Sequence, residues 1–356
     1  MTPEFWRHRR VFLTGHTGFK GGWLSLCLQN LGAELTGYAL LPSTVPNLFN
    51  TVRVAESMNS VIGDIRDYAL LRESMRRAQP EVVIHMAAQP LVRYSYANPI
   101  ETYSVNVMGT AHVLEAVREI GGVRSVVNIT SDKCYENREW IWGYRESDPI
   151  GGHDPYSSSK GCAELVTSAY RDSYFHPSGY DRHQLGLASA RAGNVVGGGD
   201  WAADRLLPDV VRAFMTGRDV IIRSPEATRP WQHVLEPLWG YLQLAERLFV
   251  DGNAYAEAWN FGPDDGDVRP VKWVVEAAAK WWGGGARLQI DPPESVLHEA
   301  HQLKLDSSKA RVRLDWCPRW RIDHAIERTI EWYKAAQQQQ DMRRFTFDQI
   351  RAYGRS

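Results

Sequence analysis

The sequence has few cysteines, and their arrangement favours neither disulfides nor a metal site. The 356-residue chain contains 4 cysteines, which lie far apart without the C-x-x-C spacing of metal and redox motifs. Its 11 histidines form no H-E-x-x-H or similar cluster. We therefore expect no disulfide framework, no bound metal ion and a reducing, cytoplasmic environment.

Long apolar runs and a strong net charge are also missing. No stretch approaches the roughly 18 apolar residues that a membrane helix needs, and no apolar signal-peptide segment follows the basic residues 1–10. The formal net charge is -1, which gives no bulk attraction to nucleic acid or to an anionic membrane. The expected partners therefore include neither nucleic acid nor a membrane.

The first half of the chain alternates short β-rich runs with helical patterns. The runs are apolar at nearly every position, which is typical of strands buried on both faces of a parallel sheet. This alternation predicts an α/β fold with a Rossmann-type, doubly wound parallel sheet. The expected strands are 10–15, 34–40, 60–65, 81–88, 125–131 and 185–197, with helices over 20–32, 68–78 and 100–121.

The pattern changes near residue 198, where a loop rich in Gly and Asp begins. The remainder mixes helices, such as 274–282 and 322–340, with short connections. We therefore predict two lobes, residues 1–197 and a smaller α/β lobe over residues 198–356, and we expect the chain to cross back into the sheet.

A glycine turn follows the first expected strand. Gly15, Gly18 and Gly21 have G-x-x-G-x-x-G spacing and open the first helix. A dinucleotide pyrophosphate needs such a close backbone approach and a helix N-terminus pointing at it. The alternative is a glycine-rich turn without a ligand, but the position after the first strand favours the dinucleotide.

The end of the second expected strand bears on the choice of dinucleotide. The segment GYALLPSTVP carries no acid for the adenosine ribose, and no Arg or Lys for a 2′-phosphate appears before Arg53. The absence of a cation favours NAD over NADP. Asp64, after the third strand, is placed either to meet the adenine or to cap a helix.

Two further groups of residues carry possible chemistry. Tyr156 and Lys160 are four residues apart in a helical run, so they share one face, and an ammonium beside a phenol lowers the pKa of the phenol. Ser131, Asp132 and Lys133 follow the fifth expected strand. Without their context, this acid and base would be no more than a surface ion pair.

Together these motifs resemble the extended short-chain dehydrogenase/reductase family over essentially the whole chain. The matching motifs are Gly15-x-x-Gly18-x-x-Gly21, Asp64-Ile65, HMAA (85–88), NVMGT (106–110), Tyr156-x-x-x-Lys160 and RAGNVVG (191–197). The segments TSDKCY, RAGNVVGGGDW and RPWQHVLEP look like those of its nucleotide-sugar 4,6-dehydratases, and among them of the enzymes that act on CDP-glucose.

The resemblance implies a lyase reaction with NAD, which loses water from the sugar through internal hydride transfer from C4 to C6. By carry-over, Tyr156 takes the C4 hydroxyl proton and Ser131 donates to the C4 oxygen. Asp132 is then the acid at C6 and Lys133 the base at C5. Related dehydratases have Glu where this chain has Lys133, and a lysine acts as a base only if burial or neighbouring cations lower its pKa.

The resemblance also implies binding residues, a quaternary state and a pathway. Cofactor contacts are expected from Gly15, Gly18, Phe19, Lys20, Gly21, Asp64, Ile65, Ala87, Asn106, Tyr156 and Lys160. Substrate contacts are expected from Gln89, Asn194, Trp201, Arg205, Arg229 and Asn260, with His233 either a ligand contact or a core residue. The family commonly forms homodimers or dimers of dimers, and such dehydratases serve dideoxysugar synthesis for O-antigen and lipopolysaccharide.

Three alternatives remain at this point. A nucleotide-sugar 4-epimerase would share the glycine turn and the Tyr156–Lys160 pair but would need no Asp132–Lys133. A dehydratase for GDP-mannose or another nucleotide sugar is disfavoured only because the motifs look more like those of the enzymes that act on CDP-glucose. A non-catalytic binding protein of the same fold would usually have lost Tyr156 or Lys160.

Overall fold

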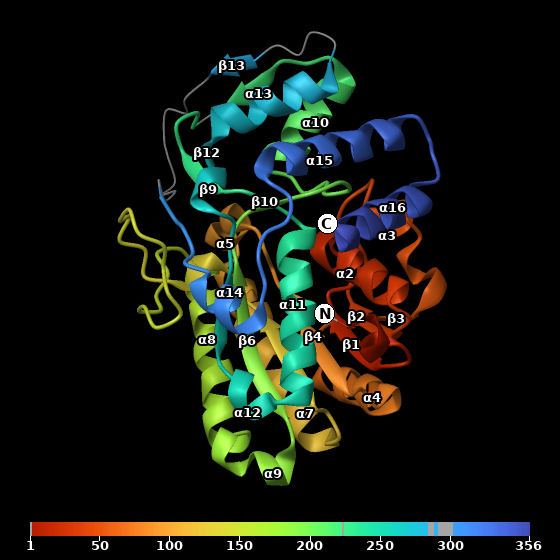
Figure 1. Ribbon diagram of the computed structural model, residues 1–356, viewed down its shortest axis with the longest axis vertical. Helices are drawn as coiled ribbons and strands as arrows, with labels where there is room; N and C mark the ends of the chain where they lie inside the picture. The colour runs from red at the N-terminus through yellow and green to blue at the C-terminus, as the bar shows by residue number, and fades with distance from the viewer. Residues whose placement is uncertain (1, 223, 284–287, 291–301) are drawn as a thin grey trace.

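The protein is built around one parallel sheet of seven strands (Figure 1). The computed structural model describes residues 2–222, 224–283, 288–290 and 302–356. The strand order is β11-β6-β5-β4-β1-β2-β3. The strands are β1 (Arg10–Thr14), β2 (Glu34–Ala39), β3 (Asn59–Ile62), β4 (Val82–His85), β5 (Ser125–Ile129), β6 (Gly186–Ala192) and β11 (Ala258–Phe261). The predicted doubly wound α/β fold is confirmed.

The central strands are apolar because both of their faces are covered by helices. Phe12 and Val83 pack in the core under α4 (Tyr68–Ala78), α7 (Gly109–Ile120) and α8 (Pro155–Tyr174). Their neighbours Leu13 and Ile84 point to the opposite face, because side chains alternate along a strand. That face is covered by α2 (Phe19–Asn30) and α11 (Leu235–Val250).

The strand order reverses beside β1, which pairs with β2 on one side and with β4 on the other. The connections after β1 and β4 therefore leave the sheet toward opposite faces. Ligands of open α/β sheets bind in the crevice that this divergence creates at the carboxyl ends of the strands. The glycine turn and the segment after β4 both lie at this edge.

The second half of the chain is not a separate layer. β11 pairs with β6 in the main sheet, and α11 packs on β5 and β6. Figure 1 shows α10, α13 and α15 gathered at one end of the molecule. The division into two lobes at residue 197 stays a prediction. The main sheet contains strands from both before and after this residue. The remaining elements of this half are β7 (Val195–Val196), α10 (Leu206–Thr216), β8 (Val220–Ile222), β9 (Thr228–Pro230), β10 (Gln232–His233), α12 (Gly252–Tyr255), η5 (Asp265–Asp267), β12 (Val268–Pro270), α13 (Val271–Trp282), β13 (Leu288–Ile290), α14 (Ser308–Leu314), α15 (Ile322–Gln337) and α16 (Met342–Arg355).

Two expected elements are interrupted. The strand expected over 185–197 is β6 followed by the separate β7, because the chain turns at Gly193 and Asn194 and β7 pairs with β10 instead. The helix expected over 100–121 contains the π-helical turn η2 (Ser104–Met108), a distortion that is frequent at functional sites. The short elements of the first half are α1 (Pro3–Trp6), α3 (Leu48–Thr51), η1 (Val54–Ser57), α5 (Val92–Ala97), α6 (Pro99–Tyr103), η3 (Asp132–Cys134), η4 (Pro177–Gly179) and α9 (Tyr180–His183).

Within the described ranges, no helix has both the length and the apolar character that a bilayer crossing requires. Several tryptophans, including Trp6, Trp23, Trp259 and Trp332, are fully buried in the core. His233 is also fully buried, between the rings of Trp23 and Trp320. The question that the sequence left open for His233 is therefore answered in favour of the core.

Candidate active site

The predicted catalytic residues meet at the carboxyl end of β5. Ser131, Asp132 and Lys133 follow this strand directly, and Tyr156 and Lys160 lie in the first two turns of α8. The Lys160 Nζ donates to the Ile129 carbonyl at 3.3 Å, which ties α8 to the end of the strand. Ser131 and Tyr156, which are 25 residues apart in the sequence, therefore lie at the same end of the sheet.

Local sequence fixes where α8 begins. The Asp154 carboxylate accepts from the Ser157 backbone N–H at 2.9 Å and caps the helix, and Pro155 occupies the first helical position. This start sets Tyr156 and Lys160 one turn apart on the same face. Both side chains are buried, with 8% of Tyr156 and 6% of Lys160 exposed.

Burial dominates the proton affinities of this pair. It lowers the pKa of Lys160 to about 8, although the nearby Glu164 carboxylate acts in the opposite direction. It raises the pKa of Tyr156 to about 12, against the opposing effects of a hydrogen bond with Ser131 and the Arg205 charge. The expected lowering of the phenol pKa is not met here, because desolvation outweighs the Arg205 charge.

The segment after β5 forms a tight 3₁₀ turn around the acid. The Ser131 Oγ donates to the Asp132 Oδ1 at 3.0 Å and accepts from the Lys133 backbone N–H at 3.2 Å. Only 3% of Asp132 is exposed, and its Oδ2 has no hydrogen-bond partner among the described residues. Burial raises the pKa of this carboxyl, while the charges of Lys133 and Lys20 lower it. A buried carboxyl with a raised pKa and an unused oxygen is suited to give a proton to a ligand.

The glycine turn shows why each tight position excludes a side chain. Gly15 has φ +84°, and a Cβ there would lie 2.8 Å from the Ala87 nitrogen. A Cβ on Gly21 would lie 2.0 Å from the Gly15 carbonyl oxygen. Gly18 is exposed at the N-terminus of α2, and the Phe19 ring packs against Gly197. The turn therefore offers a bare helix N-terminus, which is the arrangement that dinucleotide binding needs.

Lys20 places a positive charge in the first turn of α2. Burial and the charges of Arg205 and Lys160 lower its pKa to about 8, and the Asp132 carboxylate acts in the opposite direction. Its Nζ lies 5.9 Å from the centre of the Tyr241 ring. In the described part of the chain, it makes no hydrogen bond or ion pair. A cation at a helix N-terminus is unfavourable without an anion, so Lys20 fits a site for a diphosphate.

Three expected substrate residues lie near the same centre. Arg205 is paired with Asp200, Nη1 to Oδ2 at 3.0 Å, and its charge lowers the pKa of Tyr156. Arg229 in β9 is 6% exposed, and its charge lowers the pKa of Asp132. Asn194 is half-buried beside Gly193, where a Cβ would lie 2.9 Å from the Asp132 Oδ2. Arg229 and the Gly193–Asn194 segment therefore lie at the Asp132 carboxyl, and Arg205 lies nearer to Tyr156.

Four other expected residues have their polar atoms engaged within the protein. Asn106 bonds the backbone of Gln89 and the Ser159 Oγ, and the Gln89 amide bonds Leu91 and Thr102. These bonds brace the segment after β4 against α8. The Asn260 amide donates to Tyr144 and Asp306 and accepts from Tyr135, and Asp64 is paired with Arg66 at 2.6 Å. Ligand contacts by these four stay predictions.

Ile65 and Ala87 contribute through packing and backbone. Ile65 is 4% exposed, and a Cβ on Gly109 would lie 2.3 Å from its Cδ1, so α7 is held close to this segment. The Ala87 N–H donates to the Thr14 Oγ1 at 3.1 Å, which joins the ends of β1 and β4. Trp201 is half-buried and lies edge-on to Tyr333.

Sequence reasoning missed two features of the site. The Tyr241 hydroxyl on α11 is fully buried and, within the described residues, has no partner. Burial raises its pKa, and the Asp132 and Tyr156 charges add to this effect. Nothing in the local sequence around Tyr241 indicates this position. Glu164 forms a buried ion pair with Arg191, and its place four residues after Lys160 was a usable signal.

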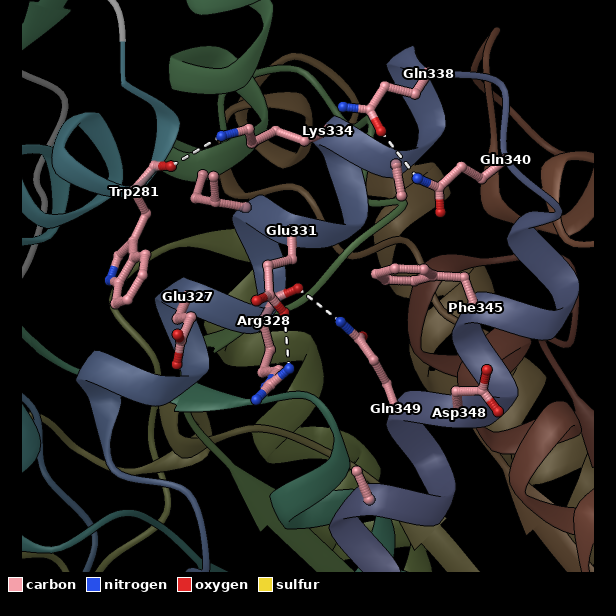
Figure 2. A pocket seen from close by; sticks show the side chains of 13 residues that line it. Trp281, Glu327, Arg328, Glu331, Lys334, Gln338, Gln340, Phe345, Asp348 and Gln349 are labelled. Carbon is pink, nitrogen blue, oxygen red and sulfur yellow. Dashed lines mark hydrogen bonds and ion pairs between the residues drawn. The ribbon is translucent and has the colours of Figure 1, made fainter.

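Two hollows of the surface lie outside this centre. A cleft of about 630 Å³ is lined by residues of α13, α15 and α16, including Trp281, Glu331 and Gln349 (Figure 2). None of the predicted site residues lines it. A groove of about 220 Å³ includes Trp201 together with Val45 and Pro46.

Similarity to known proteins places this geometry in a family. Residues 12–329 match the family described as GDP-mannose 4,6 dehydratase. The CDP-glucose 4,6-dehydratase of Salmonella typhimurium is 57% identical over 339 residues, which cover 95% of this chain and 94% of that enzyme. The chain belongs to the GDP-mannose 4,6-dehydratase family. The predicted relationship to the nucleotide-sugar dehydratases is confirmed.

Solved structures of the same fold include enzymes with different reactions. A dTDP-glucose 4,6-dehydratase from Bacillus anthracis, in complex with NAD, has a TM-score of 0.77 at 20% identity and covers 93% of this chain and 98% of its own. A UDP-glucose 4-epimerase from Thermotoga maritima, with UDP-glucose, has a TM-score of 0.76 at 19% identity, with 92% and 99% covered. The fold therefore does not separate dehydratase from epimerase, and the site residues must do so.

Proposed function

We propose that the protein is a CDP-glucose 4,6-dehydratase, an NAD-dependent lyase that converts CDP-glucose to CDP-4-dehydro-6-deoxyglucose and water. The observation that carries the reaction type is the buried Asp132, whose Oδ2 is unused, beside Ser131 and Tyr156. An epimerase has no hydroxyl to expel and needs no such acid. The 57% identity with the Salmonella typhimurium enzyme supports cytidine as the base.

The residues present fit a bound dinucleotide. The glycine turn brings the backbone to the N-terminus of α2 with no Cβ in the way, and Lys20 supplies a half-buried ammonium that has no hydrogen-bonded anion of its own among the described residues. Gly15, Gly18, Phe19, Lys20 and Gly21 would hold the diphosphate. A bound NAD would supply the hydride acceptor for C4 of the sugar and the hydride donor for C6.

The side chains after β5 and on α8 supply the proton transfers. Tyr156 removes the C4 hydroxyl proton, and Ser131 donates to the developing carbonyl oxygen. A ketone at C4 acidifies C5, so that Lys133 removes the C5 proton while Asp132 protonates the departing C6 hydroxyl. Lys133 then returns its proton to C5. Lys160 stabilises the negative charge of Tyr156.

Diphosphate and sugar recognition fall to the second half of the chain. The buried Arg229 and the partly exposed Arg205 lie near Asp132 and Tyr156, respectively, which suits the charge of a nucleotide diphosphate. Asn194, Trp201, Gln89 and Asn260 are proposed to complete the substrate site.

A homodimer is proposed on the face formed by α6, η2 and α8. This face exposes apolar side chains, with 81% of Ile100, 52% of Met108, 60% of Leu165 and 53% of Tyr174 accessible. Adjacent contacts between these helices place them on one side of the molecule. A cytoplasmic location and a role in dideoxysugar synthesis for O-antigen and lipopolysaccharide complete the proposal. Sedimentation of wild type and Leu165→Glu tests the dimer, since the glutamate should yield monomer.

The reaction is tested by incubating the purified protein with NAD and, separately, CDP-glucose, dTDP-glucose, GDP-mannose and UDP-glucose. Mass spectrometry should show the loss of one water from CDP-glucose alone. A product of unchanged mass with inverted C4 would establish an epimerase instead. Loss of water from another nucleotide sugar would keep the reaction and overturn the choice of base.

A further inference from the structure

His85 is a buried ionisable side chain that the proposed reaction does not use. It is the last residue of β4, and it is 2% exposed. In the parallel register of β1 and β4 it lies beside Thr14, the residue before the glycine turn. A buried polar ring needs hydrogen-bond partners, and both of its nitrogens have one.

The contacts of Thr14 determine which way its hydroxyl proton points. The Thr14 Oγ1 accepts from the backbone N–H groups of Met86 and Ala87, each at 3.1 Å, and it lies 2.7 Å from the His85 Nδ1. A hydroxyl has two lone pairs and one proton. Because both lone pairs are engaged with backbone N–H groups, the Thr14 proton is donated to the ring. The His85 Nδ1 is therefore the acceptor and carries no proton.

The contacts of Thr110 lead to the same form of the ring by a separate route. The Thr110 Oγ1 donates its one proton to the Asn106 carbonyl oxygen at 2.7 Å, and it lies 3.2 Å from the His85 Nε2. The proton of the second bond must therefore come from Nε2. Both sides of the ring thus define neutral imidazole with its proton on Nε2. Burial and the Lys160 charge lower the pKa of His85 to about 3, in agreement with a neutral ring.

The hydrogen bonds continue from Asn106 to the catalytic helix. The Asn106 Nδ2 donates to the Ser159 Oγ at 2.8 Å, and the Ser159 Oγ donates to the Tyr156 carbonyl oxygen at 2.7 Å. Ser159 directly precedes Lys160 and is fully buried. The bonds that begin at His85 therefore end at the turn of α8 that carries both Tyr156 and Lys160.

The opposite end of this network supports the glycine turn. Thr14 directly precedes Gly15, and it also holds the Ala87 backbone nitrogen. A Cβ on Gly15 would lie 2.8 Å from that nitrogen, so the turn packs directly on this backbone. In the sheet, β4 lies between β1 and β5. His85 is thus placed between the strand that leads into the glycine turn and the strand beside α8.

We propose that His85 is a positioning residue whose neutral, Nε2-protonated ring sets the spacing between the glycine turn and Tyr156. The inference rests on the proposed function, in which hydride passes between C4 of a sugar beside Tyr156 and a dinucleotide held by the turn. Such a transfer depends strongly on placement, and an error of about 1 Å can cost about 10²-fold in rate. A ring with one fixed proton joins Thr14 and Thr110 in a single arrangement and so keeps this spacing constant.

The first test observes the ring directly. In protein labelled with ¹⁵N-histidine, long-range ¹H–¹⁵N spectra distinguish a protonated ring nitrogen from an unprotonated one, and the His85 signals are those that disappear in His85→Gln. We expect a protonated Nε2 and an unprotonated Nδ1, with no titration across neutral pH. A ring protonated on Nδ1, or on both nitrogens, would overturn the proposal.

The second test compares His85→Leu with His85→Gln in the NAD-loaded enzyme. Leucine removes both hydrogen bonds, so the oxidation at C4 should slow about 10²-fold. The isotope effect with CDP-glucose deuterated at C4 should then rise, because this step becomes rate-limiting. The amide of glutamine has both an acceptor and a donor, and it should restore most of the rate. A less stable His85→Leu with the wild-type rate per NAD-loaded site, or equal slowing in the two variants, would overturn the positioning role.

A matched control removes a different buried imidazole. His233 is fully buried, but its Nδ1 accepts only from the Leu235 backbone, and its Nε2 has no partner among the described residues. His233→Leu should change stability without raising the isotope effect. A rise there equal to that of His85→Leu would overturn the specific role of His85. Failure of the wild type to release water would overturn the proposed function, whereas a different protonation of His85 in an active enzyme would overturn this inference alone.

Discussion

The Arg191 guanidinium in β6 forms a bidentate ion pair with the Glu164 carboxylate on α8. Its Nη2 donates to Oε2 at 2.8 Å and its Nε donates to Oε1 at 2.9 Å. Thr130 and Ser189 also donate to this carboxylate, and Arg191 donates to the Tyr135 hydroxyl at 2.6 Å. The network joins the catalytic helix to the segment that carries Ser131. A buried ion pair can add little to the free energy of unfolding. Removing one partner is nevertheless strongly destabilising, because the other is left as a buried, uncompensated charge.

Arg191→Met should therefore lower the free energy of unfolding by about 3–5 kcal/mol, because it leaves the Glu164 carboxylate buried without its cation. Denaturant unfolding measures this loss. The matched control is Arg118→Met, which breaks an Arg118–Glu115 pair that is 41% and 28% exposed and should leave the free energy of unfolding nearly unchanged. Equal losses in the two variants would contradict the buried role of Arg191.

Asp132→Asn should separate oxidation at C4 from loss of the C6 hydroxyl. The amide keeps the shape of the side chain but has no acidic proton, so water release should fall about 10²- to 10⁴-fold. Mass spectrometry should then detect a keto sugar that retains its C6 hydroxyl. The exposed Glu136 is a control, since Glu136→Gln should leave water release unchanged. Normal dehydration by Asp132→Asn would exclude Asp132 as the acid.

Lys20→Met should weaken NAD binding about 10- to 100-fold, the usual contribution of a charge-assisted contact. The pKa of Lys20 is lowered to about 8, so wild-type affinity should decline as the pH rises past 8 and the ammonium loses its proton. Titration calorimetry across this range should show no such decline for Lys20→Met. Lys20→Arg keeps the charge and should bind without the decline; an affinity of Lys20→Met equal to wild type would remove Lys20 from the cofactor site.

Glu236 should make stability depend on pH near neutrality. Its carboxylate accepts from the Tyr353 hydroxyl at 2.5 Å and the Trp320 N–H at 2.7 Å, and burial raises its pKa to about 7. The pKa of Glu236 is higher in the folded state than in the unfolded state. Its contribution to the free energy of unfolding is therefore fully present below the unfolded-state pKa and is lost as the pH rises through about 7. Relative to Glu236→Gln, the free energy of unfolding of wild type should fall by about 3 kcal/mol between the unfolded-state pKa of a glutamate and pH 7.

Paired unfolding curves at several pH values measure this difference, since most other titrations cancel between the two proteins. Glu276→Gln, at an exposed position, should track wild type throughout. A constant difference between wild type and Glu236→Gln would show that Glu236 does not titrate in this range.

The local motifs of the site were predictable because each depends on residues close in sequence. The glycine turn, the cap at Asp154 and the Tyr156–Lys160 spacing are set within a few residues by backbone geometry. The triplet Ser131–Lys133 was recognisable as chemistry only through its resemblance to nucleotide-sugar dehydratases, since a carboxylate beside a lysine is otherwise an ordinary surface pair.

The interruptions of predicted elements had a different origin. Apolar content marked residues 185–197 as strand, yet β7 leaves the sheet to pair with β10, a segment nearly 40 residues later. The π-helical turn at Ser104–Met108 likewise accompanies bonds from Asn106 to Gln89 and Ser159. Pairings of this kind depend on residues that are distant in the chain. Secondary-structure propensity in a short window of sequence carries no information about them.

The sequence alone determined the strand–helix alternation and the glycine turn, because periodicity and short motifs encode them locally. The tertiary structure alone decided their proton affinities. Desolvation raises the pKa of Tyr156 and Asp132 and lowers that of Lys20, and its size depends on how many distant segments cover each group. The tertiary structure also brought Tyr241 and Arg229 to Asp132, since only the folded sheet edge joins residues so far apart in the chain.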